Sequence, residues 1–185
     1  GGTAKIMGID ILENPSKARS NLGYMAQKFS LYGNLTLRQN LEFFASVYGI
    51  NFLNKDKRVD EIIDIFNFHD IQDMKSQDLP LGFKQRLSLA CAVIHNPPIL
   101  FLDEPTSGVD VIARREFWNH ITSLAKLGVT ILVTTHFMDE AEYCNRISLF
   151  YKGETIALGT PYELKTKANA DNMEQAFVNL IKESG

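Results

Sequence analysis

Cysteine, basic stretches and long apolar runs are all scarce in this sequence of 185 residues. Its two cysteines, Cys91 and Cys144, lie far apart and form no CxxC pair, so we interpret both as reduced thiols packed in a cytosolic protein. The four histidines show no HxxxH spacing, which argues against a metal cage. No apolar run approaches the roughly 18–20 residues of a membrane-spanning helix, and the N-terminus lacks the layout of a signal peptide.

The charge balance is slightly acidic. The formal net charge is −3, and there is no long basic run, so nucleic acid is not expected as the main partner. The hydrophobic content of 45% and the charged content of 22% are those of a folded globular protein. The length suffices for one domain, or for one domain with a small lobe.

Apolar spacing divides the chain into a helical part and an alternating part. The stretch "GTAKIMGIDI" predicts a short strand with a turn at Gly8, and the chain then looks irregular to about residue 35. Residues 30–95 are predicted to be mainly helical, and a capping box of Thr36 and Gln39 opens the first helix.

From Ile99 onward, short apolar strands alternate with helices, with one helix expected at 111–127 and a shorter one at 137–144. This alternation predicts a parallel sheet with right-handed crossovers. The chain is then expected to form a hairpin that turns at Lys152 and Gly153, followed by two helices. Thr160 and Glu163 form the capping box of the first of these.

The stretch "ILFLDEPTSGVD", residues 99–110, carries the first candidate site. We interpret its apolar run as a strand buried on both faces that stops at Pro105. Asp103 and Glu104 then lie at the carboxyl end of a parallel strand, where ligands bind in open α/β sheets. There an aspartate can hold Mg²⁺ and a glutamate can deprotonate a water. For this acidic pair alone, capping of the next turn is the favoured interpretation.

Two further polar residues are candidates for the same rim of the sheet. His136, in "TTHFMDEAE", follows the next predicted strand, where an imidazole can hydrogen-bond a terminal phosphate. Gln27 precedes the helical stretch. Taken singly, His136 also fits a helix cap or a core group, and Gln27 fits an ordinary polar loop residue.

Three motifs together resemble a known family. "LGFKQRLSLA", "LFLDEPTSGVD" and "TTHFMDEAE" occur in the order found in the ATP-binding domains of ABC transporters, and the chain looks closest to bacterial multidrug exporter ATPases, including tandem-domain types. The resemblance implies an α/β fold, a truncated P-loop NTPase core with a mainly parallel sheet plus a helical subdomain. It implies one domain fragment over 1–185, whose parts are a helical subdomain (30–96), part of a RecA-like catalytic core (97–150) and a C-terminal hairpin with helices (151–185).

The resemblance also implies ATP and Mg²⁺ as cofactors, and a role for each motif residue. Asp103 resembles the Walker B residue that holds the metal, Glu104 the general base and His136 the switch histidine on the γ-phosphate. Gln27 resembles the Q-loop glutamine that touches metal and attacking water. Ser107, Gly108 and Asp110 look like a D-loop at a dimer interface, and Leu81, Gly82 and Phe83 like the signature segment that acts on a partner's nucleotide.

The same resemblance implies partners and a location. Transmembrane permease subunits and a second ATP-binding domain are expected as partners, without nucleic acid, at the cytoplasmic face of the cell membrane. The surface from Gln27 to Asn34 is expected to receive the permease. Two other hypotheses remain open: a soluble family member that acts on ribosomes or nucleic acid, and a non-catalytic interaction fragment.

Two features depart from the family pattern. The phosphate loop GxxxxGK[ST] is absent, and the nearest imitation, "GINFLNKD" at Gly49, lacks the second glycine and the hydroxyl residue. We therefore expect that the N-terminal portion of this domain lies outside this sequence. This chain alone is expected to bind ATP very weakly and not to hydrolyse it. Exposed apolar sheet edges are expected to favour self-association. In the signature segment "LPLGF", Pro80 replaces a serine and Leu81 a glycine, whereas Gly82 is kept.

Overall fold

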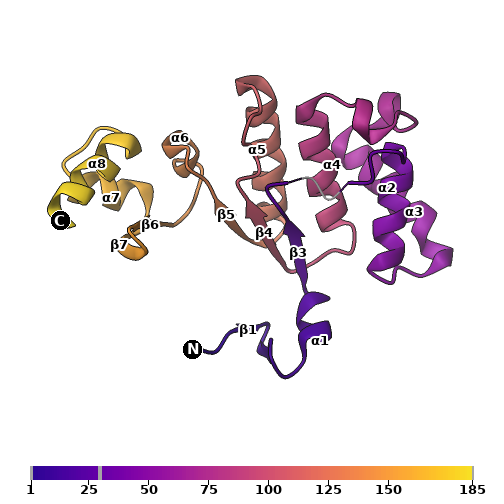
Figure 1. The fold of residues 1–185 in the computed structure, drawn as a ribbon, viewed down its shortest axis with the longest axis horizontal. Coiled ribbons are helices and arrows are strands. Elements are labelled where there is room, and N and C mark those ends of the chain that lie inside the picture. Colours follow the sequence, from indigo (N-terminus) through magenta and orange to yellow (C-terminus); the bar gives the residue numbers. More distant parts are fainter. Residues whose placement is uncertain (1, 29–30, 185) are drawn as a thin grey trace. The chain divides into compact units, whose positions relative to one another are not determined.

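The computed structural model describes residues 2–28 and 31–184, and the chain folds as two compact units that divide between Thr134 and Thr135. The strands of the first unit are β1 (Lys5–Ile6), β2 (Ile9–Asp10), β3 (Leu22–Met25), β4 (Ile99–Asp103) and β5 (Thr130–Thr134) (Figure 1). Its helices are α1 (Pro15–Arg19), α2 (Leu37–Val47), α3 (Phe52–Phe66), α4 (Leu81–Val93) and α5 (Val111–Lys126), with 3-10 turns η1 (His69–Ile71) and η2 (Ser76–Asp78).

A parallel sheet organises the first unit. Its strand order is β3-β4-β5, and both pairings are parallel, as the alternating pattern predicts. The register pairs Tyr24 with Phe101, Phe101 with Leu132, and Asp103 with Thr134. The carboxyl ends of all three strands therefore meet at one edge of the sheet, and the predicted α/β fold with a parallel sheet is confirmed.

The two faces of this sheet differ in burial. Leu100 and Leu102 point to the face against which α4 and α5 pack, and they are 0% and 2% exposed. The opposite face carries the cross-strand row Tyr24, Phe101 and Leu132, of which Tyr24 is 54% and Leu132 is 58% exposed. The prediction that these strands are buried on both faces is therefore wrong. The predicted self-association through exposed sheet edges stays a prediction.

The stretch before residue 35 is more ordered than its sequence indicates. It contains the helix α1 and the strand β3, as well as the predicted strand and turn near Gly8, which form the hairpin β1–β2. In β3, a Cβ atom on Gly23 would lie 2.4 Å from the carbonyl oxygen of Ala92. Close approach of α4 thus requires glycine here, and a glycine inside a four-residue strand weakens the pattern that would have revealed it.

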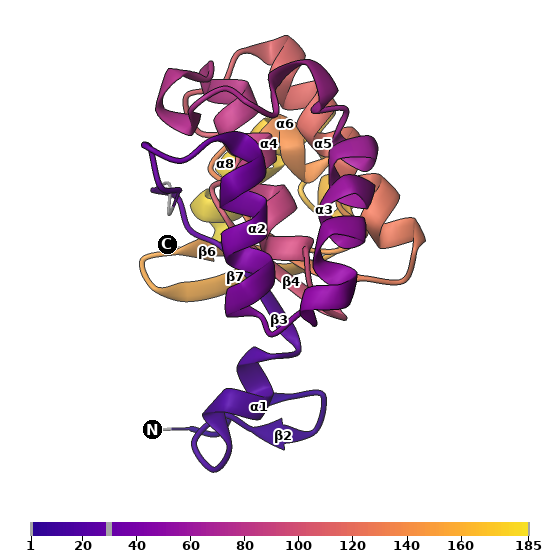
Figure 2. The same ribbon diagram turned by 90° about the vertical axis from the view of Figure 1, so that its right-hand side faces the viewer.

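The helices α2, α3 and α4 pack against one another, and Figure 2 shows α2 and α3 from the side. Both halves of the Thr36–Gln39 capping box are formed at the start of α2. The end of α4 is held by Arg58 from α3, whose Nε donates to the carbonyl oxygen of Ile94 at 2.7 Å. The predicted helical character of this region is confirmed for the described residues from 31 onward.

The second unit contains α6 (Met138–Ala141), β6 (Ile147–Tyr151), β7 (Glu154–Gly159), α7 (Pro161–Lys167) and α8 (Met173–Ser184). The strands form the predicted antiparallel hairpin with its turn at Lys152 and Gly153, both at positive φ. Helix α6 is shorter than the predicted 137–144. The core of this unit consists of Ala141, Ile147, Leu149, Ala157, Leu164, Ala168, Met173, Ala176 and Leu180. Within the described part of the chain, no helix has the length and apolarity to cross a membrane.

Candidate functional site

The two predicted acids lie at the carboxyl end of β4. Asp103 is the last residue of the strand, and Glu104 follows it with a left-handed φ of 44°. The Glu104 backbone N–H donates to two atoms of Thr134, the carbonyl oxygen and Oγ1, each at 3.1 Å. These bonds hold a backbone conformation that side-chain-bearing residues seldom adopt, and such conformations concentrate at functional sites.

The Thr134 hydroxyl joins the two acids. It donates to Oδ1 of Asp103 at 2.7 Å while it accepts from the Glu104 N–H. Both contacts follow from the parallel register, which places Thr134 directly beside Asp103. One side chain of β5 thus orients the carboxylate of Asp103 and the backbone of Glu104.

Gln27 meets the same acids from the third strand. It lies two residues beyond the end of β3, and its Nε2 donates to Oε2 of Glu104 at 2.7 Å. These two residues are 77 positions apart in the sequence, and the parallel pairing of β3 with β4 brings them together. The structure therefore gathers Gln27, Asp103 and Glu104 at one edge of the sheet.

His136 belongs to the second unit. Its exposed ring lies 4.1 Å from the ring of Phe137, tilted by 35°. The preceding Thr135 donates its hydroxyl to Oε2 of Glu140 at 2.6 Å and accepts from the Phe137 N–H at 3.0 Å. Glu140 is 0% exposed, so a buried carboxylate anchors the turn that carries His136. The position of His136 beside the acids stays a prediction.

The signature segment begins helix α4. Leu81 is the first helical residue, and Pro80 stands at the N-cap without a side-chain hydrogen bond. A Cβ atom on Gly82 would lie 2.8 Å from the Cβ of Ala113 in α5, so this glycine permits close contact between two helices. A Cβ on Gly108 would lie 3.4 Å from Cδ2 of Leu81, which places the Leu81 side chain against the D-loop segment.

The other D-loop and signature candidates make contacts inside their own unit. Asp110 caps α5, accepting from the N–H groups of Ile112 at 3.0 Å and Ala113 at 3.1 Å. The N–H of Ser107 donates to the carbonyl oxygen of Glu104 at 3.2 Å. The ring of Phe83 lies 4.2 Å from the guanidinium carbon of Arg86. Their predicted contacts with a second domain stay predictions.

The residues at this edge of the sheet suit a magnesium ion that also binds substrate phosphates better than a metal ion held by protein side chains alone. Among the residues that the structure describes, no cluster of three or more His, Cys, Asp and Glu side chains is arranged to hold a metal. Mg²⁺ typically binds one or two carboxylates and completes its shell with waters and substrate phosphates. Asp103 and Gln27, the two residues predicted to hold the metal, form a donor set of that kind.

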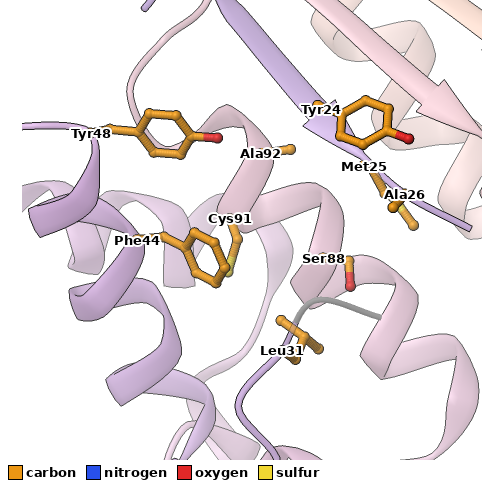
Figure 3. A pocket seen from close by; sticks show the side chains of 9 residues that line it. All are labelled: Tyr24, Met25, Ala26, Leu31, Phe44, Tyr48, Ser88, Cys91 and Ala92. Carbon is orange, nitrogen blue, oxygen red and sulfur yellow. The ribbon is translucent and has the colours of Figure 1, made fainter. Parts of the chain in front are cut away.

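A small pocket lies between β3, α2 and α4 (Figure 3). Its lining includes Tyr24, Phe44, Tyr48, Ser88 and Cys91, and it encloses about 30 Å³. That volume holds one water molecule, whereas small-molecule ligand sites measure about 300–1,000 Å³, so a nucleotide does not fit.

Burial raises the pKa of the Cys91 thiol, and Cys91 and Cys144 are both free, as predicted. Phe29 and Ser30, part of the surface predicted to meet a permease, lie outside the described residues.

Comparison with known proteins gives the family. The family model described as "ABC transporter" matches residues 1–107. The chain belongs to the ABC transporter family. It is 55% identical to the probable multidrug ABC transporter ATP-binding protein YbhF of Escherichia coli K12 over 97% of this chain and 32% of that protein. It is 31% identical to the linearmycin resistance ATP-binding protein LnrL of Bacillus subtilis 168, over 99% of this chain and 59% of LnrL.

A solved structure of this family supports the fold. The ATP-binding subunit of an ABC transporter superimposes with a TM-score of 0.81 at 24% identity, over 96% of this chain and 75% of the other. The chain spans about a third of the length of the YbhF relative, at 32%. Membership of this family therefore accounts for the α/β fold and for the order of the motifs.

Two polar residues that hold candidate site residues within their own units are not predicted from the sequence. Thr134 and Glu140 belong to the segment quoted for its histidine, "TTHFMDEAE", but neither was singled out. Strand alternation offers a signal for Thr134, because residues 130, 132 and 134 share a face and 134 comes last. Glu140 carries no comparable signal, since a glutamate in a short helix is normally exposed.

Proposed function

We propose that this chain is the ATP-binding and ATP-hydrolysing part of an ABC-type exporter that couples hydrolysis to transmembrane transport. The observation that carries the proposal is the hydrogen bond between Gln27 and Glu104 beside Asp103, at the edge where three parallel strands end. Relatives named for multidrug transport and for linearmycin resistance support export as the direction.

In this proposal the polar side chains divide the chemistry among them. Glu104 accepts a proton from the attacking water, and Gln27 orients that water while it holds the Glu104 carboxylate in place. His136 donates a hydrogen bond to the terminal phosphate. Positioning of this kind supplies most of the rate in phosphoryl transfer, because the protein contributes little covalent chemistry.

Asp103 and Gln27 would hold the magnesium ion. Bound Mg²⁺ neutralises charge on the nucleotide phosphates. The bond from Thr134 to Oδ1 of Asp103 fixes the carboxylate that would contact it. Leu81, Gly82 and Phe83 would face the nucleotide of a second domain, with Ser107, Gly108 and Asp110 at the interface between the two.

Transmembrane permease subunits and a second ATP-binding domain complete the proposed assembly at the cytoplasmic face of the membrane. The proposed parts within the chain remain a helical subdomain at 30–96, a catalytic part at 97–150 and a C-terminal part at 151–185. The permease would contact the surface from Gln27 to Asn34.

Substitution of the proposed base in the full-length protein that carries this chain tests the function. Glu104→Gln keeps the shape of the side chain but removes its basicity, so phosphate release should fall about 100- to 10,000-fold. Binding of MgATP, measured by calorimetry, should persist. Glu154→Gln, at an exposed glutamate at the start of β7, serves as the matched control and should leave phosphate release unchanged. Equal phosphate release from Glu104→Gln and from the unaltered protein would refute the assignment.

A further inference from the structure

Thr134 makes two hydrogen bonds with different partners through one hydroxyl group. It donates to Oδ1 of Asp103 at 2.7 Å and accepts from the backbone N–H of Glu104 at 3.1 Å. We propose that Thr134 is a positioning residue that sets the Asp103 carboxylate and the Glu104 backbone in register with each other. The expected effect of Thr134 on metal binding rests on the proposed function. The orientation of the two acids by Thr134 does not depend on that function.

The chemistry of the hydroxyl makes this role specific. A threonine hydroxyl carries one proton to donate and lone pairs to accept, and here both capacities are used. Valine has the same branching at Cβ and suits a strand equally well, but it can make neither bond. Serine keeps the hydroxyl and therefore keeps both bonds.

Glu104 depends on such support more than an ordinary strand residue does. Its φ of 44° lies in the left-handed region, which is unfavourable for a residue with a side chain. Its N–H is shared between the carbonyl oxygen and the hydroxyl of Thr134. Its carboxylate is tied to Gln27, so a shift of the Glu104 backbone would also move the Gln27 contact.

The same strand offers a matched control. Thr130 begins β5 on the same face as Thr134, but its register partner is Ile99. Thr130→Val therefore removes a hydroxyl from the same strand and face without a carboxylate beside it. Any general effect of valine in β5 appears in both variants, whereas loss of positioning appears only in Thr134→Val.

The first experiment measures hydrogen exchange at the Glu104 amide in the full-length protein, by mass spectrometry with residue-level fragmentation. Thr134→Val should accelerate exchange about tenfold, because the amide loses one of two acceptors and the bridge to Asp103 is broken. Thr134→Ser and Thr130→Val should exchange as the unaltered protein does. Unchanged exchange in Thr134→Val would overturn the positioning role.

The second experiment measures Mn²⁺ binding by electron paramagnetic resonance with a non-hydrolysable ATP analogue. Thr134→Val should weaken Mn²⁺ binding by roughly 10- to 100-fold, as loss of outer-shell partners typically does, and Thr134→Ser should restore it. The variant Asp103→Asn separates the proposed metal role of Asp103 from the proposed positioning role of Thr134. If it leaves Mn²⁺ binding intact, the proposed metal role fails while the exchange result still decides positioning. If it abolishes binding but Thr134→Val has no effect, the positioning of Asp103 is refuted.

Discussion

At the scale of single residues, Gly23 shows how tightly the helical layer meets the sheet. A Cβ atom there would lie 2.4 Å from the Ala92 carbonyl oxygen and 2.8 Å from Cδ1 of Leu100. We predict that Gly23→Ala lowers the free energy of unfolding by about 1–3 kcal/mol, because the backbone of α4 must move to admit the methyl group. Urea denaturation of the 185-residue chain measures this change.

Gly33→Ala is the control for this prediction. Its Cβ would lie 3.3 Å from Cβ of Gln77, a contact that a small local shift relieves. Its effect on the denaturation midpoint should be small beside that of Gly23→Ala. Equal midpoints for the two variants would show that α4 adapts to Gly23→Ala without strain.

The acids and their orienting residue differ in how far the sequence predicts them. Asp103 and Glu104 stand out because charges end an apolar run, and the structure indeed places them at the end of β4. Thr134 is one of two adjacent threonines, and only the register of β5 against β4 selects it as the neighbour of Asp103. Register is a property of the folded sheet, so strand alternation could mark Thr134 as the last residue on its face but could not pair it with Asp103.

At the scale of elements, capping chemistry was predictable and the short strand β3 was not. The Thr36–Gln39 and Thr160–Glu163 boxes each show both reciprocal bonds, because the pattern itself encodes the contact. Strand β3 has four residues with a glycine among them, and it forms because β4 pairs with it. The sequence also does not predict the half-exposed face of the sheet, because an apolar run does not show whether one face of a strand or both are covered.

The box at α7 predicts an acid-sensitive contribution to stability. The backbone N–H of Thr160 donates to Oε2 of Glu163 at 2.8 Å, and this bond, with a further one to the Thr160 side chain, holds the pKa of Glu163 below its usual 4.5. A carboxyl group with a lowered folded-state pKa stabilises the folded chain above its unfolded pKa, and that contribution is lost as the pH falls through the folded value.

Thermal unfolding between pH 6 and pH 3 therefore tests the box. The unaltered chain should lose stability below about pH 4.5 more steeply than Glu163→Gln, which cannot titrate at this position. Glu174→Gln, near the start of α8, provides a control with an exposed glutamate in the same unit. Identical pH profiles for the unaltered chain and Glu163→Gln would contradict the prediction.

At the scale of the whole molecule, the parallel sheet gathers acids but this chain carries no GxxxxGK[ST] loop to attract phosphate. We predict that the 185-residue chain by itself binds ATP with a dissociation constant of roughly 1 mM or weaker, because Asp103 and Glu104 repel the phosphates. Calorimetry in the presence and absence of Mg²⁺ measures this affinity.

Neutralisation of both acids is the informative comparison. Without Mg²⁺, Asp103→Asn combined with Glu104→Gln should bind ATP more tightly than the unaltered chain, since the repulsion has been removed. Submicromolar binding by the unaltered chain would show instead that other groups in the molecule anchor the triphosphate.

The contact between Gly82 and Ala113 has an evolutionary consequence. Because the two Cβ positions would stand only 2.8 Å apart, bulk added at one site has to be matched by bulk removed at the other. Across homologues, the sizes of these two residues should therefore covary, even though they are far apart in sequence. An aligned set of exporter ATPases in which both positions enlarge together would mark a lineage where the two helices have moved apart.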